Sequence, residues 1–204
     1  MSDPSEVYYI VLRGSRWQPI FKDDEDLRRF TLGVSECATA CGVTVHAYCW
    51  LAAEARLAVQ MGAGVPISQF AQCMADWHTR QAERDAPLTG SHFEQKYRGV
   101  RVDGQTALVD LVRHIHLAPL KAGLTDDLLD YTWSSHRAYL GLQACSWLTT
   151  RATLQELAHT CGGGDAERGY REFMLQGVEQ LDAVSIPREN SERAGADEAD
   201  LHAK

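Results

Sequence analysis

Apolar residues recur at every second position over residues 43–59, and this period predicts two adjacent strands. The first half, VTVHAYCW, places Val, Val, Ala and Cys at alternate positions. The second half, EARLAV, alternates again and begins with two charged residues that are two positions apart. Side chains two apart on a strand point to the same face, so this charged pair would be presented together to one site.

The rest of the pattern predicts an α+β fold. A β-rich run at 7–13 is followed by a helix that begins in an acidic segment and ends before Gly42. After the strand pair we expect a helix over 66–84, a strand over 93–103 and an apolar helix over 105–117. This order is typical of a ferredoxin-like split βαβ antiparallel sheet, and we expect its helices on one face.

The C-terminal third predicts helices without strands. Helical segments are expected at 133–139, 150–160 and 166–182. We therefore divide the chain into a first domain over 1–141, a helical C-terminal extension over 142–184 and an acidic tail over 185–204. The tail has few large apolar side chains with which to form a core, so we expect it to be disordered.

Charge and hydropathy narrow the function classes. The 204 residues carry a net charge of −8, which argues against a protein that coats nucleic acid and limits any nucleic-acid site to a small basic patch. The sequence has no apolar run of membrane-spanning length, and its N-terminal segment lacks the basic-then-apolar order of a signal peptide. We therefore expect a cytoplasmic protein without membrane contact.

Four segments between residues 7 and 141 match known motifs in order and spacing. They are YYIVLRGSRWQPIFKDDEDLRRF, HAYCWLAAEARLAV, LVRHIHLAPLKAGL and YTWSSHRAYLG. The first is similar to an opening strand, LRG loop and acidic helix start, and the others are similar to HAYCMPNHVHLLL, LVRYIHLNPVRAGL and YPWSSYRAYLG. These are motifs of the REP-associated tyrosine transposases in the single-tyrosine HUH superfamily, which the chain resembles.

The resemblance implies single-strand DNA chemistry beside small hairpins. In the family a tyrosine attacks a phosphate, and a divalent metal, Mg²⁺ or Mn²⁺, polarises the phosphodiester. Two histidines that flank one hydrophobic residue hold this metal, and Glu54 and Arg56 occupy their places here. A guanidinium has no lone pair to donate. We therefore expect no metal cofactor and a salt bridge between these two side chains.

The nucleophile of the family is also expected to be missing. We place it on the helix over 66–84, which contains no tyrosine. Trp77 lies nearest the expected position and has no nucleophilic oxygen, and Gln81, one turn on, matches a polar position of the family. With Glu54 and Arg56, these residues indicate a degenerate member without catalytic activity.

A basic region could still bind phosphate groups. Five bases stand against two acids between residues 95 and 123, and the first loop adds more bases. The alternatives are a solvated face and a remnant phosphate-binding track. The residues that we expect to bind DNA are Arg13, Arg16, Lys96, Arg98, Arg101, Arg113, His114, His116 and Arg137.

The sequence therefore predicts a transposase-like DNA-binding protein without catalysis, which recognises hairpin or single-stranded DNA in a regulatory or nucleoprotein-complex role. Two alternatives stay open. The acidic body favours a protein-interaction module that has lost DNA binding, and an active single-strand DNA transposase with an unorthodox site is the other. The expected partner is DNA, with protein partners and a homodimer left open.

Overall fold

The computed structural model describes residues 6–14, 19–84, 98–160 and 165–181. Four strands form one antiparallel sheet in the order β2-β3-β1-β4. They are β1 Val7–Arg13, β2 Thr44–Trp50, β3 Glu54–Gln60 and β4 Arg98–Val102. This is the ferredoxin-like order, and it confirms the predicted α+β fold. In the described part of the chain, no helix is long and apolar enough to cross a membrane.

The first helix, α1 (Asp24–Cys41), begins and ends where the sequence predicted. The Asp23 side chain accepts a hydrogen bond from the Asp26 backbone N–H at 2.9 Å, which caps the first turn, where three acids also favour the helix dipole. Gly42 ends the helix with φ 63°, a left-handed conformation that glycine adopts without a steric penalty.

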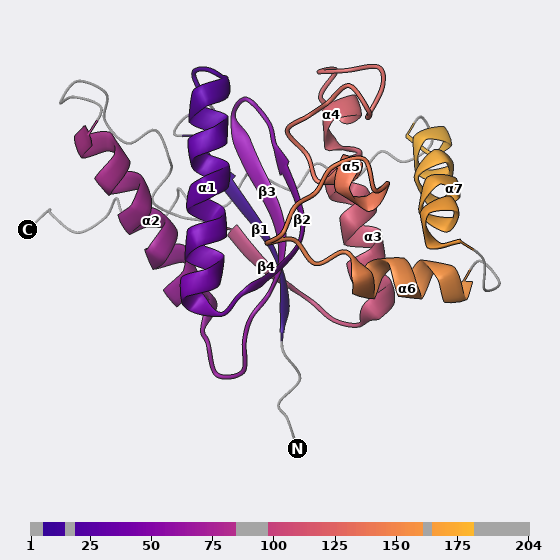
Figure 1. Cartoon of the computed structure of the whole chain (residues 1–204), viewed down its shortest axis with the longest axis horizontal. Helices are drawn as coiled ribbons and strands as arrows, with labels where there is room; N and C mark the ends of the chain where they lie inside the picture. Colours follow the sequence, from indigo (N-terminus) through magenta and orange to yellow (C-terminus); the bar gives the residue numbers. More distant parts are fainter. Residues whose placement is uncertain (1–5, 15–18, 85–97, 161–164, 182–204) are drawn as a thin grey trace, which may run out of the picture.

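The helices α1 and α2 (Ile67–Arg84) cover one face of the sheet (Figure 1). A core of buried apolar side chains, Phe30 and Phe70 among them, fills the space between these helices and the strands. The indole of Trp77 lies against Gly33 of α1, and its Nε1 donates to the Glu36 carboxylate at 3.1 Å. The two helices therefore approach each other where α1 has no side chain.

This close approach predicts a packing defect in the Gly33→Ala variant. A Cβ atom at this position would lie 2.5 Å from the Trp77 ring, so a buried indole would have to move. We expect the free energy of unfolding to fall by about 1 to 3 kcal/mol, the usual cost of overpacking a core. Urea denaturation would measure it. The matched control is Leu32→Ala, at an exposed neighbouring position, which should change stability by less than about 0.5 kcal/mol.

The remaining helices are α3 Gln105–His116, α4 Ala118–Lys121, α5 His136–Tyr139, α6 Arg151–Thr160 and α7 Ala166–Glu179. On the second face of the sheet α3 packs directly against β2 and β3, and α6 and α7 pack against α3 (Figure 1). A second core cluster joins α3 and α7 to the strands, and it includes Val112 and Ile115 of α3 with Ala47 and Ala58 of the sheet. The prediction of helices on one face therefore holds for α1 and α2 only. Because β2 and β3 are apolar on both sides, the second face also needs a cover.

A chain of polar side chains is buried between α3, α5 and α7. Tyr170 Oη lies 2.6 Å from His136 Nδ1 and 2.8 Å from His116 Nδ1. On its other side, His116 Nε2 lies 2.6 Å from Ser135 Oγ, which also accepts a hydrogen bond from the Tyr48 backbone N–H of β2. These contacts link the C-terminal extension to the sheet through hydrogen bonds as well as apolar packing.

Candidate functional site

The charged pair stands at the start of β3, an inner strand of the sheet, and Arg56 faces α3. Glu54 is paired in register with Arg13 of β1, and Arg56 with Val11 of β1 and Cys49 of β2. Arg56 Nε donates to Glu54 Oε1 at 2.7 Å, and Arg56 Nη2 donates to the same oxygen. Arg13 Nε lies 3.3 Å from Glu54 Oε2. The predicted salt bridge between Glu54 and Arg56 is therefore confirmed, and both oxygens of the buried carboxylate meet a guanidinium.

His114 of α3 lies directly over this pair. Its Nε2 atom is 3.3 Å from Arg56 Nη1 and 3.3 Å from Tyr9 Oη. Burial and the positive charges of Arg56 and Lys121 lower the pKa of His114 to about 4. The imidazole is therefore neutral at pH 7, and its Nε2 lone pair can accept a hydrogen bond from the guanidinium.

Lys121, at the end of α4, adds a third cation. Burial and the charges of Arg56 and Arg113 lower the pKa of Lys121, so its ammonium group lies within electrostatic range of both guanidinium groups. We call the following residues the strand-face cluster: Tyr9, Arg13, Glu54, Arg56, His114 and Lys121. It holds three cations and one carboxylate, so an anion bound beside it would relieve the repulsion. Guanidinium groups are also well suited to phosphate oxygens.

A divalent metal does not fit the donor set of the strand-face cluster. Both Glu54 oxygens are occupied by guanidinium groups, and Arg56 has no lone pair to offer a cation. The Nε2 atom of His114 is directed at Arg56 rather than at an open position. Within the described residues, no three His, Cys, Asp or Glu side chains are grouped so that they could hold a metal ion.

The helix that faces the charged pair is α3, whereas α2, on which the sequence predicted the nucleophile position, packs on the opposite face of the sheet. Trp77 of α2 belongs to the core on the opposite face of the sheet, and the Gln81 side chain lies outside the described residues. The family motif LVRYIHLNPVRAGL, quoted above, carries a tyrosine where this chain has His114. This difference between the two motifs was the sequence signal that could have pointed to His114 as a residue of the site. Tyr9 was missed because it comes from a different strand.

One predicted DNA-binding residue faces away from this site. Arg101 is paired in register with Tyr8 of β1, whose side chain packs on the α1 and α2 side of the sheet. Its guanidinium is held by two carboxylates, with Nη1 2.7 Å from Glu6 Oε1 and Nε 2.8 Å from Asp103 Oδ1. The predicted set is therefore divided between the two faces of the sheet.

Two other arginines of the predicted set have local partners. Arg113 Nη2 lies 2.9 Å from Asp110 Oδ1, and its guanidinium stacks 4.0 Å from the ring centre of Phe173. Arg137 Nη1 donates to the Leu129 carbonyl at 2.9 Å and so holds the loop before α5. These contacts give both residues a structural role.

His116 has 0% relative exposure and belongs to the buried polar chain, so it has no surface with which to contact DNA, and we leave it out of the candidate interface. Arg16, Lys96 and the side chain of Arg98 lie outside the described residues. Of the predicted DNA-binding residues, the structure brings together Arg13 and His114. It adds Arg56 and Lys121 to them.

Comparison of the fold with known structures gives the following likenesses. A REP-associated tyrosine transposase bound to a REP hairpin matches with a TM-score of 0.59 and 9% sequence identity, over 73% of this chain and 94% of that chain. A Deinococcus radiodurans protein that is provisionally named a transposase matches with a TM-score of 0.42 and 12% identity, over 61% and 92% of the two chains. No family model and no curated protein matches the sequence. The first likeness shows that the chain has the fold of a REP-associated tyrosine transposase.

Proposed function

We propose that the chain binds hairpin or single-stranded DNA through the strand-face cluster and does not cut it. The observation that carries this proposal is the position of Arg56. Its guanidinium stands where the family places a metal-holding histidine, and it is paired with Glu54 and His114. This fixed cation can bind a phosphate, but it cannot polarise the phosphate as a metal does. Its presence therefore supports binding without cleavage.

The surroundings of the cluster support a phosphate as its ligand. The side chain of Arg56 retains 20% exposure and that of Arg13 24%, so both guanidinium groups reach the surface from the sheet. Lys121 of α4 lies within electrostatic range of Arg56, in a protein whose overall charge is negative. A bound phosphodiester would be attracted to this local excess of positive charge, while the remaining acidic surface would repel the rest of a long duplex. This combination favours a short, structured DNA element and suits a regulatory or nucleoprotein-complex role.

The salt dependence of binding tests the role of Lys121. Fluorescence anisotropy with a labelled stem-loop oligonucleotide, repeated at several salt concentrations, gives the slope of log K against log salt. Each phosphate contact contributes about 0.7 to 0.9 to this slope. We expect Lys121→Ala to weaken binding and to lower the slope by about that amount. Arg101→Ala is the matched control, because two carboxylates already neutralise that arginine on the opposite face.

The outcome for the wild-type protein separates the two leading functions. Tighter binding of the stem-loop than of a scrambled single strand at physiological salt would support DNA recognition. Equal binding of both oligonucleotides would contradict it. A protein-interaction module would then be the better assignment, which the net charge of −8 favours.

We further propose that the chain uses no metal and forms no covalent DNA adduct. Incubation with labelled hairpin DNA and Mg²⁺ or Mn²⁺ should leave no denaturant-resistant complex, because His114, which replaces the tyrosine of the LVRYIHLNPVRAGL motif, has no hydroxyl group to attack a phosphate. Calorimetry should detect no metal site of micromolar affinity that Glu54→Ala removes. Tyr9 is the tyrosine of the strand-face cluster, with its hydroxyl 3.3 Å from a neutral histidine. An adduct that Tyr9→Phe abolishes would instead establish an active enzyme with an unorthodox site.

A further inference from the structure

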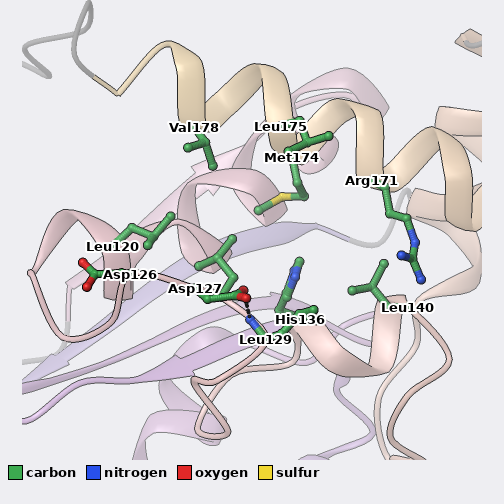
Figure 2. A pocket seen from close by; sticks show the side chains of 11 residues that line it. Leu120, Asp126, Asp127, Leu129, His136, Leu140, Arg171, Met174, Leu175 and Val178 are labelled. Carbon is green, nitrogen blue, oxygen red and sulfur yellow. Dashed lines mark hydrogen bonds between the residues drawn. The ribbon is translucent and has the colours of Figure 1, made fainter.

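A cavity of about 340 Å³ lies between α7 and the segment that runs from α4 to α5 (Figure 2). Its size is within the range of small-molecule sites. Most of its walls are apolar side chains. They include Leu120, Leu129, Leu140, Met174, Leu175 and Val178. Three of these, Leu129, Leu175 and Val178, are large apolar side chains with substantial exposure, which is unfavourable unless something covers them.

His136 is a buried polar residue that lines this cavity. It has 5% relative exposure, and its Nδ1 atom is bonded to Tyr170 Oη at 2.6 Å. No described residue makes a hydrogen bond to its Nε2 atom, yet every fully buried polar side-chain atom in the described part of the chain has a partner. The Nε2 atom is therefore not fully buried. Because His136 lines the cavity, we infer that this atom is accessible from it. It can bond to a molecule held there.

The buried polar chain allows His136 to present either a donor or an acceptor. Tyr170 has one hydroxyl proton and stands between two histidine nitrogens, His136 Nδ1 and His116 Nδ1. If Tyr170 donates to His116, then His136 Nδ1 carries a proton and Nε2 is an acceptor. If Tyr170 donates to His136, then His136 Nε2 carries the proton, and His116 Nε2 accepts from Ser135, 2.6 Å away. Both arrangements satisfy every member of the chain.

The charges around the cavity exclude an acidic ligand. Asp126 and Asp127 line one end, and Arg171 is the cation among the lining residues. One Asp127 oxygen is already bonded to the Leu129 backbone N–H at 2.8 Å, as the dashed line in Figure 2 shows. A carboxylate, or the phosphate beside a DNA base, would meet more negative than positive charge here. Met174 on the opposite wall offers a thioether, which makes favourable contacts with aromatic rings.

We propose that this cavity binds a small, neutral heteroaromatic molecule, whose ring lies between the leucine and methionine walls and whose polar atom hydrogen-bonds to His136 Nε2. The inference is independent of the proposed DNA binding, because the cavity is lined by none of the residues of the strand-face cluster. A ligand seated there would also contact both α7 and the segment before α5, so it would hold the C-terminal extension against the first domain.

Indole and indene test this proposal on the full chain. The two molecules have the same bicyclic shape, but only indole carries an N–H group. An NMR titration should show saturable shifts at Met174 and Val178 with both, and about fivefold tighter binding of indole, the usual worth of one net hydrogen bond. His136→Phe keeps a ring at the position and should remove the preference for indole. Val178→Trp, at a position that is 38% exposed, should block both ligands without a cost to folding.

Leu32→Trp, on an exposed position of α1, should leave both affinities unchanged. Equal affinity for indole and indene would overturn the role of His136, and unchanged binding in Val178→Trp would overturn the location. Displacement of indole by a single-stranded oligonucleotide would show that the cavity accepts a DNA base. That result would contradict the proposal that its ligand is a small free molecule. Failure of stem-loop binding would leave all of these results unaffected.

Discussion

Acidification from pH 7 to about pH 4 should remove several kcal/mol from the free energy of unfolding. Burial, reinforced by nearby cations, lowers the pKa of His114 to about 4, and burial lowers that of His136 to about 4, from an ordinary value near 6.5. Burial also lowers the pKa values of His46 and His116. Each of the first two shifts corresponds to about 3 kcal/mol, against a typical total stability of about 5 to 15 kcal/mol.

The sign of this effect follows from proton binding. Because the folded-state pKa is depressed, the unfolded chain binds more protons than the folded chain between about pH 6.5 and pH 4. Stability from these histidines is therefore complete above pH 6.5 and is lost as the pH falls through the folded-state value. Urea denaturation at a series of pH values would measure the slope. His114→Gln should flatten it, whereas His159→Gln, on an exposed position of α6, should not. A slope that is the same in both variants would contradict this prediction.

Replacement of Arg56 by methionine should destabilise the protein by about 3 kcal/mol and also weaken DNA binding. The change removes the main partner of Glu54, whose side chain is only 8% exposed, and leaves the carboxylate with Arg13 at 3.3 Å. Removal of one member of a buried ion pair typically costs about 3 to 5 kcal/mol, since the other charge stays buried without compensation. Denaturation with urea and the stem-loop assay would measure the two effects.

The double variant Glu54→Gln/Arg56→Met is the control for this mechanism. It removes both charges together, so it should be more stable than Arg56→Met alone by more than about 1 kcal/mol. Arg56→Lys should retain part of the DNA binding but lose the two-nitrogen contact with Glu54, because an ammonium group lacks the guanidinium fork. A double variant that is less stable than the single one would show that size, rather than charge, determines the effect.

Local pattern was sufficient to predict the strands and helices, but not how they face one another. The period-two alternation predicted β2 and β3, yet it placed Val45 on the same face as Ala47. The structure has a register shift at His46, so that Val45 belongs to the core under α1 and Ala47 to the core under α3. One extra residue at a β-bulge reverses the faces that follow it, and no local signal marked this position.

The candidate site could be predicted only in part, for a related reason. The Glu54 and Arg56 pair is local on one strand, so its salt bridge followed from spacing and charge. The contact between Arg56 and His114 joins residues that are 58 positions apart, and it depends on α3 lying across the second face of the sheet. Because the sequence pattern did not show which helix covers which face, Trp77 was assigned to a site on the wrong side of the sheet.

The hydrogen bond between Tyr170 and His116 bears on how this chain can change over evolutionary time. The extension supplies the hydroxyl group that satisfies a histidine at the centre of the first domain. An exchange of the segment after residue 164 between relatives would succeed only if the incoming helix carried a comparable hydrogen-bonding group at the same place. A substitution at either residue is therefore expected to constrain which substitutions the other can accept.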